Sequence, residues 1–394
     1  MDASTIRPPV GNDGSSRARR RLVALATAAV MSVGVPVVAA PAAQGAECSG
    51  SYRAEAVQQG GTWIARNGGR QVYSGPDMRS AVQAAIGSLT PGRTTRERVV
   101  VRGSGTMSAG SRISLPSHTA LEVCGTINVT GSGSGDQAVV YARGVRDVEV
   151  TRLRVTGTPL YGIFMRNVTD VHLGQIDLRL NGAGLGIRID NHGNRAERSR
   201  NIRIDDVYVQ GTGSHGVETY GVDGLRVGSV TARSTGYSGL LLNDTTHADV
   251  GLVDAVGAGT GTGYAALRMA NRNGRVGTGY PTNIRVGTVR AQGGGRGIFC
   301  VSESGGVVID RVELTRTGNN PVLIENCYNV SLATSGGTVS GGDVRLAARS
   351  EFPNNRDVTL QNLRLTDGAR VVENPCAVNF VVRGVEPTSA VRRC

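Results

Sequence analysis

The chain has 394 residues, with 43 cationic and 31 acidic side chains, a formal net charge of +12 and no lysine. The absence of lysine excludes mechanisms that need a lysine base, a Schiff base or the lysine of a phosphate-binding loop. Glycine is abundant, at 57 residues, but without a Gly-X-Y period, which excludes collagen. A hydrophobic content of 39% is enough to bury a core and argues against wholesale disorder.

The first 46 residues are typical of a secretory signal peptide. Arg17 and Arg19 to Arg21 precede an apolar run over residues 22–40, and small residues follow up to Ala46. The apolar run is close to membrane-spanning length, so a membrane anchor is the alternative. Cleavage would remove five arginines and two aspartates, which lowers the net charge to about +9. We expect a secreted protein that has no membrane association after cleavage.

All six cysteines follow this segment, and an even number in an exported chain predicts up to three disulfides. We expect Cys48–Cys124 to hold the N-terminal end and Cys376–Cys394 to hold a C-terminal tail over residues 381–394. The spacing of the remaining two, Cys300 and Cys327, does not place them in register, so their pairing stays open. None of the six has metal-ligand spacing with a histidine.

Residues 47–94 are predicted to form a hairpin and a short capping helix. Two strand-like segments, 62–65 and 71–73, flank the turn signal Asn67-Gly68. Asp77 is a candidate N-cap for a helix over 78–86, whose apolar residues share one face. We expect this helix to cover the end of the repeat that follows, which begins near residue 98.

A short pattern of two aliphatic residues around one variable residue recurs nine times, from Val148 to Leu360, in steps of 23, 31, 23, 25, 34, 23, 23 and 28 residues. Its period-two alternation indicates strands, which excludes a helical repeat. A second short strand starts five residues later, and a third, usually opening with glycine, completes the unit. Three short strands in a coil of about 23 residues predict a parallel β-helix with stacked aliphatic ladders inside. The leucine-rich-repeat consensus is absent, and propeller blades would need longer units.

The coils over residues 95–380 resemble the right-handed parallel β-helix proteins of the pectin-lyase-like superfamily. That group contains polysaccharide lyases, polygalacturonase-type hydrolases, epimerases and phage tailspikes. The resemblance implies an all-β fold, a right-handed single-stranded parallel β-helix with the short N-terminal capping helix. It also implies that a sugar chain binds along the face of the first strand of each coil, between loops on either side.

Three insertions indicate where such a groove would lie. The residues in excess of the 23-residue period fall in 192–199, 272–281 and 350–355, and each of these segments lies between the first and second strands of its coil. Insertions on one edge would build a wall beside the first-strand face, as repeat proteins do on their binding side. Neutral loop growth at a tolerant edge is the alternative interpretation.

Asp190 and Glu218 are the candidate catalytic carboxyl groups on this face. If Glu218 stacks on Arg188, it lies diagonally from Asp190, at about 8 Å between the two backbones. That separation fits the gap of roughly 6.5–9.5 Å in inverting glycosidases, where one carboxylic acid protonates the leaving oxygen and the other carboxylate activates water. Arg188 would lower the pKa of one carboxyl group and leave the other as the acid. The alternative is a structural Arg188–Glu218 pair with a solvated Asp190.

His215, between Ser214 and Gly216, resembles the Gly-His-Gly segment of polygalacturonase-type hydrolases and is the third candidate catalytic residue. That family's paired-aspartate and Arg-Ile-Lys segments are absent. We interpret the remaining histidines His118, His172 and His247 as surface residues. Further outward residues on the same face are predicted to bind substrate: Arg188, His192, Tyr220, Asn243, Arg268 and Glu325.

Together these patterns predict a secreted, monomeric enzyme that cleaves a polysaccharide, most simply by inverting hydrolysis without a cofactor. The basic surface favours an acidic polymer. One alternative is β-elimination on uronates, with His215 as base and Arg188 or Arg268 holding the enolate. Such a lyase could use calcium, although no acid cluster resembles a calcium site. The other alternative is a glycan-binding surface solenoid without activity. No nucleic-acid-binding motif is present, and stacking aromatics are few.

Overall fold

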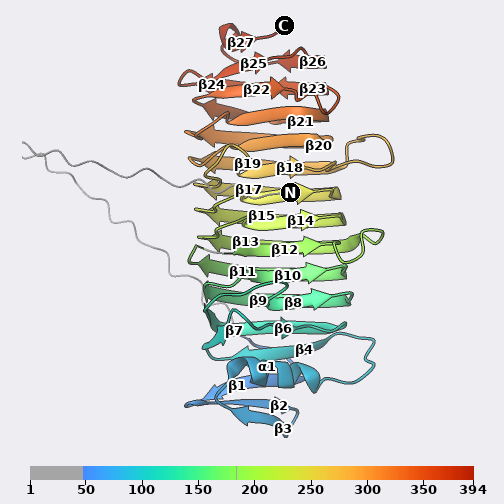
Figure 1. Ribbon diagram of the computed structural model, residues 1–394, viewed down its shortest axis with the longest axis vertical. Helices are drawn as coiled ribbons and strands as arrows, with labels where there is room; N and C mark the ends of the chain where they lie inside the picture. Colours follow the sequence, from blue (N-terminus) through green and yellow to red (C-terminus); the bar gives the residue numbers. More distant parts are fainter. Residues whose placement is uncertain (1–47, 183) are drawn as a thin grey trace, which may run out of the picture. The chain divides into compact units, whose positions relative to one another are not determined.

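A computed structural model describes residues 48–182 and 184–394, and the predicted signal peptide lies outside them. The described chain winds into a β-solenoid of about 13 turns, with its coils stacked along one axis (Figure 1). Parallel pairing links each coil to the next, for example β9 (Arg146–Gly157) to β11 (Thr169–Leu180) and β11 to β13 (Ser199–Gln210). The predicted all-β parallel β-helix is therefore confirmed. No helix of the described residues is long and apolar enough to cross a membrane.

The N-terminal end carries a hairpin and a helix, as expected. Strands β1 (Ala54–Gln59), β2 (Thr62–Asn67) and β3 (Arg70–Gly75) pair in antiparallel fashion, and β1 also pairs in parallel with β4 (Glu97–Arg102). Helix α1 (Met78–Gly87) begins at Asp77, whose side chain accepts a hydrogen bond of 2.7 Å from the Ser80 amide. Its buried face consists of the apolar residues that the sequence pattern indicated, Met78, Ala81, Val82, Ala85 and Ile86. The helix thereby covers the apolar interior at this end.

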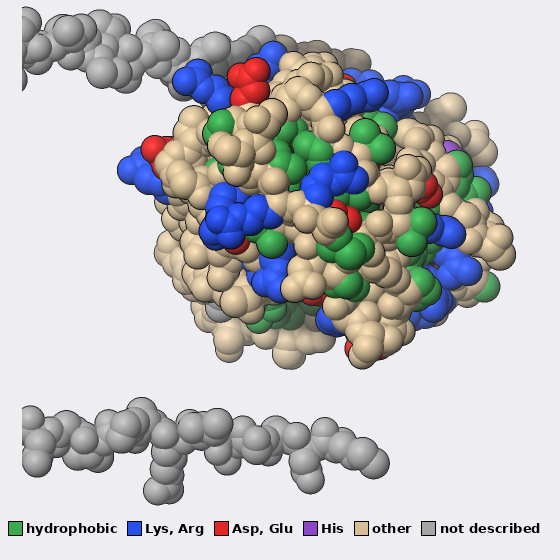
Figure 2. Space-filling model, turned by 90° about the horizontal axis from the view of Figure 1, so that it is seen from above, with side chains coloured by type: hydrophobic (Ala, Val, Ile, Leu, Met, Phe, Trp, Pro, Cys, Tyr) green, Lys and Arg blue, Asp and Glu red, His purple; other side chains and the backbone are tan. Residues whose placement is uncertain are grey.

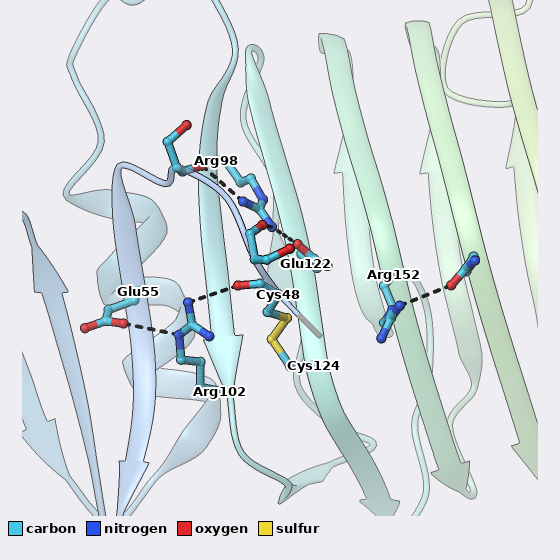
Figure 3. The surroundings of a disulfide bond; sticks show 10 residues. Cys48, Glu55, Arg98, Arg102, Glu122, Cys124 and Arg152 are labelled. Carbon is cyan, nitrogen blue, oxygen red and sulfur yellow. Dashed lines mark hydrogen bonds and ion pairs between the residues drawn. A yellow bond between two sulfur atoms is a disulfide. The ribbon is translucent and has the colours of Figure 1, made fainter. Parts of the chain in front are cut away.

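The start of the described chain is fixed to the first coils (Figure 3). The predicted disulfide Cys48–Cys124 is present, with 5.9 Å between the two Cα atoms. Arg102 donates a hydrogen bond of 3.1 Å to the Cys48 carbonyl, and Arg98 forms an ion pair with Glu122. One covalent bond and these polar contacts therefore hold this segment against the solenoid.

One side of the solenoid is a sheet built from the first strand of each coil, called here the first-strand sheet. Its shorter members are β6 (Ile113–Ser114), β8 (Ala138–Arg143), β10 (Tyr161–Arg166), β12 (Leu185–Asp190), β14 (Val217–Tyr220), β16 (Leu240–Asn243), β18 (Leu267–Ala270), β22 (Asp343–Ala347), β25 (Arg370–Glu373) and β27 (Val391–Arg392). The first residues of β20 (Ile298–Thr315) and β21 (Val322–Ser340) continue it between β18 and β22.

The second and third strands of most coils form one long, bent strand. These are β7 (Thr119–Thr130), β9 (Arg146–Gly157), β11 (Thr169–Leu180), β13 (Ser199–Gln210), β15 (Val222–Arg233), β17 (Thr246–Val256) and β19 (Ile284–Gln292), with β5 (Gly105–Ser108), β23 (Arg356–Gln361), β24 (Leu363–Thr366) and β26 (Val378–Arg383) as shorter equivalents. Coils approach so closely at the bends that a Cβ atom at Gly174 would lie 2.3 Å from the Thr151 carbonyl oxygen. Part of the glycine content is thus a requirement of stacking.

Residue ladders fill the interior as the repeat predicted. Val148, Val171, Ile202 and Leu225 stack in consecutive coils and are almost completely buried. Burial of such ladders in every coil is the main favourable contribution to folding. The Cys300–Cys327 pair, left open above, is also bonded, with 6.2 Å between its Cα atoms. Cys300 is in register with Ile324 and Cys327 with Ser304, so this bond crosses a corner and does not follow a ladder.

The C-terminal end is also paired. Cys376–Cys394 forms as expected, but residues 381–394 are more than a tail, because β26 pairs with β23 and β27 with β25. Figure 2 looks onto this end of the solenoid and shows hydrophobic side chains among scattered arginines. Val378 and Val381 of β26 are 64% and 38% exposed.

Candidate active site

The strand register places the predicted site residues in two rows across the first-strand sheet. Glu218 lies between Arg188 and Leu241, and Leu241 is in register with Arg268. Two residues further along each strand, Asp190, Tyr220, Asn243 and Ala270 form the second row. The expected lateral contact between Arg188 and Glu218 is therefore confirmed, and Arg268 belongs to their row.

The Asp190 carboxylate is completely enclosed. Its side chain is 0% exposed and accepts hydrogen bonds from Arg166 at 2.6 and 3.0 Å and from Arg188 at 2.8 Å. Burial acts to raise the pKa of Asp190, but the hydrogen bonds and charges of Arg166 and Arg188 outweigh it and lower the pKa. This differs from the solvent-facing aspartate expected above, because Arg166 of the preceding coil covers it. This carboxylate has no solvent-exposed surface in the structure.

Glu218 is largely buried but keeps an open side. Its carboxylate, 8% exposed, accepts hydrogen bonds of 3.1 Å from Arg188 and of 3.1 Å from Asn243. The Asn243 amide is in turn held by Asn271 at 2.9 Å. Burial raises the pKa of Glu218, and the Arg188 charge and the Asn243 hydrogen bond only partly oppose it. Glu218 is therefore the carboxyl group of this face that is suited to exchange a proton.

Arg268 is a cation without an anionic partner among the described residues. Its Nε is buried and makes no hydrogen bond, and its guanidinium lies 5.8 Å from the Tyr264 ring centre and 5.4 Å from that of Phe299. Burial lowers the pKa of Arg268, which still remains protonated in water. Leu241, 2% exposed, separates it from Glu218. The row thus presents a positive group, an apolar floor and a carboxyl group in succession.

His215 lies two residues before β14 and is held neutral. The Ser238 amide donates a hydrogen bond of 3.1 Å to His215 Nδ1, which places the ring proton on Nε2. Burial, followed by the Arg268 and Arg188 charges, lowers the pKa of His215 to about 3. With its Nδ1 lone pair occupied, this histidine is suited to donate a hydrogen bond. The geometry does not favour the role of base considered above.

A pair of tyrosines borders His215 on the edge opposite the predicted wall. Tyr237 and Tyr264 stack with 3.9 Å between ring centres and 12° between planes, and the His215 ring meets each of them edge-on. Tyr237 is 37% exposed. The pair was missed from sequence, although a signal existed. The glycine-rich connection 257–266 between β17 and β18 is longer than the equivalent 234–239.

The other predicted binding residues divide into two groups. His192 accepts a hydrogen bond of 3.2 Å from Arg188 and meets the Tyr220 ring at 4.4 Å, so both lie beside Glu218. Glu325 is in the second row but on β21, four strands from β14, or about 19 Å away. It forms an ion pair of 2.8 Å with Arg349. The structure therefore brings together all the predicted residues of this face except Glu325.

The three insertions follow β12, β18 and β22, on one edge of the first-strand sheet. The loops after β12 and β18 project from the same side of the solenoid (Figure 1). Against this edge lies a cavity of about 420 Å³, bordered by Arg195, Tyr220, Arg272 and Phe352 among others. The predicted wall is present.

The described part of the chain contains no group of three or more His, Cys, Asp or Glu side chains placed to hold a metal ion. Both candidate carboxylates are instead held by arginines. These residues do not fit the oxygen cluster that calcium requires.

No protein-family model matches the chain, and no curated protein matches it. Several solved structures are similar. The mannuronan C-5 epimerase AlgE4 A-module of Azotobacter vinelandii is 13% identical with a TM-score of 0.44, over 78% of this chain and 91% of that one. The pre-mature bacteriophage phi29 gene product 12 is 16% identical with a TM-score of 0.38, over 80% and 55%. The catalytic domain of a GH87 alpha-1,3-glucanase in complex with nigerose is 11% identical with a TM-score of 0.30, over 77% and 67%.

Proposed function

We propose that the protein is a secreted enzyme that cleaves an acidic polysaccharide by β-elimination at a uronate. The observation that carries this proposal is the position of Arg268, which has no anionic partner among the described residues, in the same row as Glu218 with only the Leu241 floor between them. A desolvated guanidinium without a partner is suited to bind a carboxylate. The three disulfides are typical of proteins outside the cytosol, which agrees with export.

Each side chain of the site has a separate role in the proposed reaction. The uronate carboxylate pairs with Arg268, whose charge stabilises the enolate that forms there. Glu218 takes the proton from C5, the carbon next to the carboxylate. The electrons of that bond form the C4–C5 double bond, the C4–O bond breaks, and the leaving oxygen takes a proton from Tyr237 or Tyr264. His215 donates a hydrogen bond from Nε2 to the bound sugar.

Arg188 and Asp190 act as positioning residues. Asp190 is held between Arg166 and Arg188, and this ion pair orients Arg188 toward Glu218. Burial raises the pKa of Glu218, and the Arg188 charge opposes this effect. Asp190 therefore supports the base indirectly.

Inverting hydrolysis fits the geometry less well. It requires a second carboxylate that reaches a water molecule on the opposite face of the sugar. Asp190 is not exposed, and Glu325 lies four strands away and is paired with Arg349. Elimination needs only one carboxylate together with a cation, and both are present.

The test is to incubate wild-type protein with a panel of acidic polysaccharides and to follow both new reducing ends and the ultraviolet absorbance of unsaturated uronates. We expect both signals to rise together, and Glu218→Gln to abolish both while leaving the circular dichroism spectrum unchanged. Glu313→Gln is the matched control, because Glu313 pairs with Arg290 at 2.8 Å on another side of the solenoid. Reducing ends without absorbance would favour hydrolysis. Binding without either product would favour a non-catalytic glycan-binding protein.

A further inference from the structure

Arg296 carries a buried positive charge that no carboxylate neutralises directly. It is 7% exposed, the lowest value among the arginines of residues 48–182 and 184–394, and it forms no ion pair with a residue of these ranges. Buried charges in proteins are normally paired, because burial removes the water that stabilises them. Burial accordingly lowers the pKa of Arg296, which still remains protonated in water. A guanidinium in this state is suited to bind an anion.

Neutral acceptors hold the Arg296 guanidinium in place. Its Nε donates a hydrogen bond of 3.0 Å to the Thr262 carbonyl, and its Nη1 donates one of 3.3 Å to the side-chain oxygen of Asn320. These two acceptors belong to the connections 257–266 and 316–321, which lead into β18 and β21. Nη2 makes no hydrogen bond among the described residues. A guanidinium that is already fixed, with one nitrogen free, loses little conformational entropy when it binds an anion.

The acids near Arg296 are already bound to another arginine. The Glu325 charge favours the protonated form of Arg296, but Glu325 forms its ion pair, of 2.8 Å, with Arg349. Glu351 binds the same Arg349 guanidinium at 2.8 Å. The exposed Arg345 of β22 adds a further positive charge that lowers the pKa of Arg296. Positive charge is therefore in excess around Arg296.

Phe299 connects Arg296 to the cation of the proposed site. The guanidinium groups of Arg268 and Arg296 lie 5.4 Å and 5.3 Å from the centre of the Phe299 ring, so they are within about 11 Å of each other. Phe299 is in register with Arg268, and it belongs to a buried apolar cluster with Leu241 and Leu323. Charges over such an apolar floor are screened weakly, so two cations placed there repel each other. Two bound anions would relieve this repulsion.

We infer that Arg296 is a second anion-binding residue of this site, so that the ligand carries anionic groups on two adjacent sugar units. The inference rests on the proposed function, because it takes a uronate carboxylate to be bound at Arg268. Arg296 comes two residues before β20, the strand that pairs with β18, so the second anion lies on the C-terminal side of the first. Its chemistry is that of an oxyanion that accepts hydrogen bonds from a guanidinium, either the carboxylate of a neighbouring uronate or a sulfate ester.

Two pairs of oligosaccharides of equal length differ only in the second anion. Oligogalacturonate carries a carboxylate on every unit, whereas its alternately methyl-esterified form has uncharged neighbours beside each free uronate. Chondroitin sulfate oligosaccharides carry a sulfate ester beside each uronate, and chondroitin oligosaccharides lack it. Calorimetric titration of Glu218→Gln, in which cleavage is prevented, measures binding alone. We expect Kd to be about ten-fold lower for the doubly anionic member of at least one pair, and that pair identifies the second anion.

Variants of Arg296 test whether this residue causes the preference. Arg296→Gln should remove it while changing Kd for the singly anionic member by less than about two-fold. Arg296→Lys keeps the charge and should retain part of the preference, a rescue that a purely structural arginine would not show. Arg93→Gln is the matched control, because Arg93 also donates to a backbone carbonyl, that of His118 at 2.8 Å, but precedes β4 near the N-terminal end. Equal loss of both ligands in Arg296→Gln, without rescue in Arg296→Lys, would show a structural role and overturn the inference.

Cleavage assays with the wild-type protein separate this inference from the proposed function. A preference that is lost in Arg296→Gln, without unsaturated products from any of the four ligands, would retain the second anion site and overturn the elimination. Unsaturated products formed from both members of each pair with equal kcat/KM, unchanged in Arg296→Gln, would overturn the second anion site and retain the elimination. Binding of none of the four ligands would overturn both.

Discussion

Arg268 and Arg188 lie in the same row of the first-strand sheet, yet only the replacement of Arg188 by methionine should lower the stability of the protein strongly. Arg188 bonds to both Asp190 and Glu218, whereas Arg268 has no anionic partner among the described residues. An arginine that serves the fold destabilises the protein when it is removed. An arginine whose role is to bind a ligand does not destabilise the protein when it is removed. The pair Arg268→Met and Arg188→Met therefore tests the assignment of the binding cation.

The magnitudes follow from the contacts. The Arg268 Nε is buried and has no hydrogen-bond partner in the described part of the chain, so Arg268→Met removes a penalty of about 1–3 kcal/mol. The two lost cation–π contacts offset this by about 0.5–1 kcal/mol each. The unfolding free energy should thus stay within about 1 kcal/mol of wild type or rise. Arg188→Met leaves two buried carboxylates short of a partner, which costs about 3 kcal/mol, the low end of the range, because Arg166 still holds Asp190.

Urea unfolding followed by circular dichroism measures both values, and binding of an acidic oligosaccharide to folded Arg268→Met measures the lost function. We expect a difference of about 3 kcal/mol between the two variants, together with loss of binding in Arg268→Met. If Arg268→Met were as destabilising as Arg188→Met, Arg268 would be a structural residue and the argument from an unpaired cation would be wrong.

Three further outcomes are expected. Glu218 must be ionised to act as a base, and its raised pKa places the acid limb of the pH profile of kcat/KM above pH 4.5. An acid limb at or below pH 4.5 would contradict the role of Glu218 as the base. Three surface aspartates, Asp147, Asp205 and Asp223, are bonded to histidines, and these hydrogen bonds outweigh burial and lower the pKa of each carboxyl group. Their contribution to stability is present above about pH 4 and is lost as the pH falls through the pKa of the folded state. A melting temperature that stays constant down to about pH 3 would refute this contribution. Replacing both Cys300 and Cys327 by serine removes a disulfide that spans 27 residues, and it should lower the free energy of unfolding by about 3.5 kcal/mol. A decrease of less than about 1 kcal/mol in urea unfolding would show that the disulfide contributes little.

The coil architecture could be predicted because it depends on local alternation and on a period. Inward and outward positions alternate along each strand, so the repeat alone placed Val148, Val171 and Ile202 in one buried ladder. The same arithmetic aligned Arg188 with Glu218 across 30 residues of sequence. The helix after Asp77 followed from its cap and its apolar face.

The properties of the site depend on contacts between coils, and the alternation of inward and outward residues along a strand does not predict these contacts. Asp190 is an outward residue by its position, but Arg166 of one coil and Arg188 of its own enclose it and remove it from water. The disulfide between Cys300 and Cys327 joins two residues that are not register partners, because it crosses a corner of the coil. Tyr264 lies in the 257–266 connection, and its contacts with Arg268 and His215 join residues of different coils. Sequence therefore determined which side chains share a row, whereas tertiary packing decided which of them reach solvent, which are neutralised, and which cation has no anionic partner within residues 48–182 and 184–394.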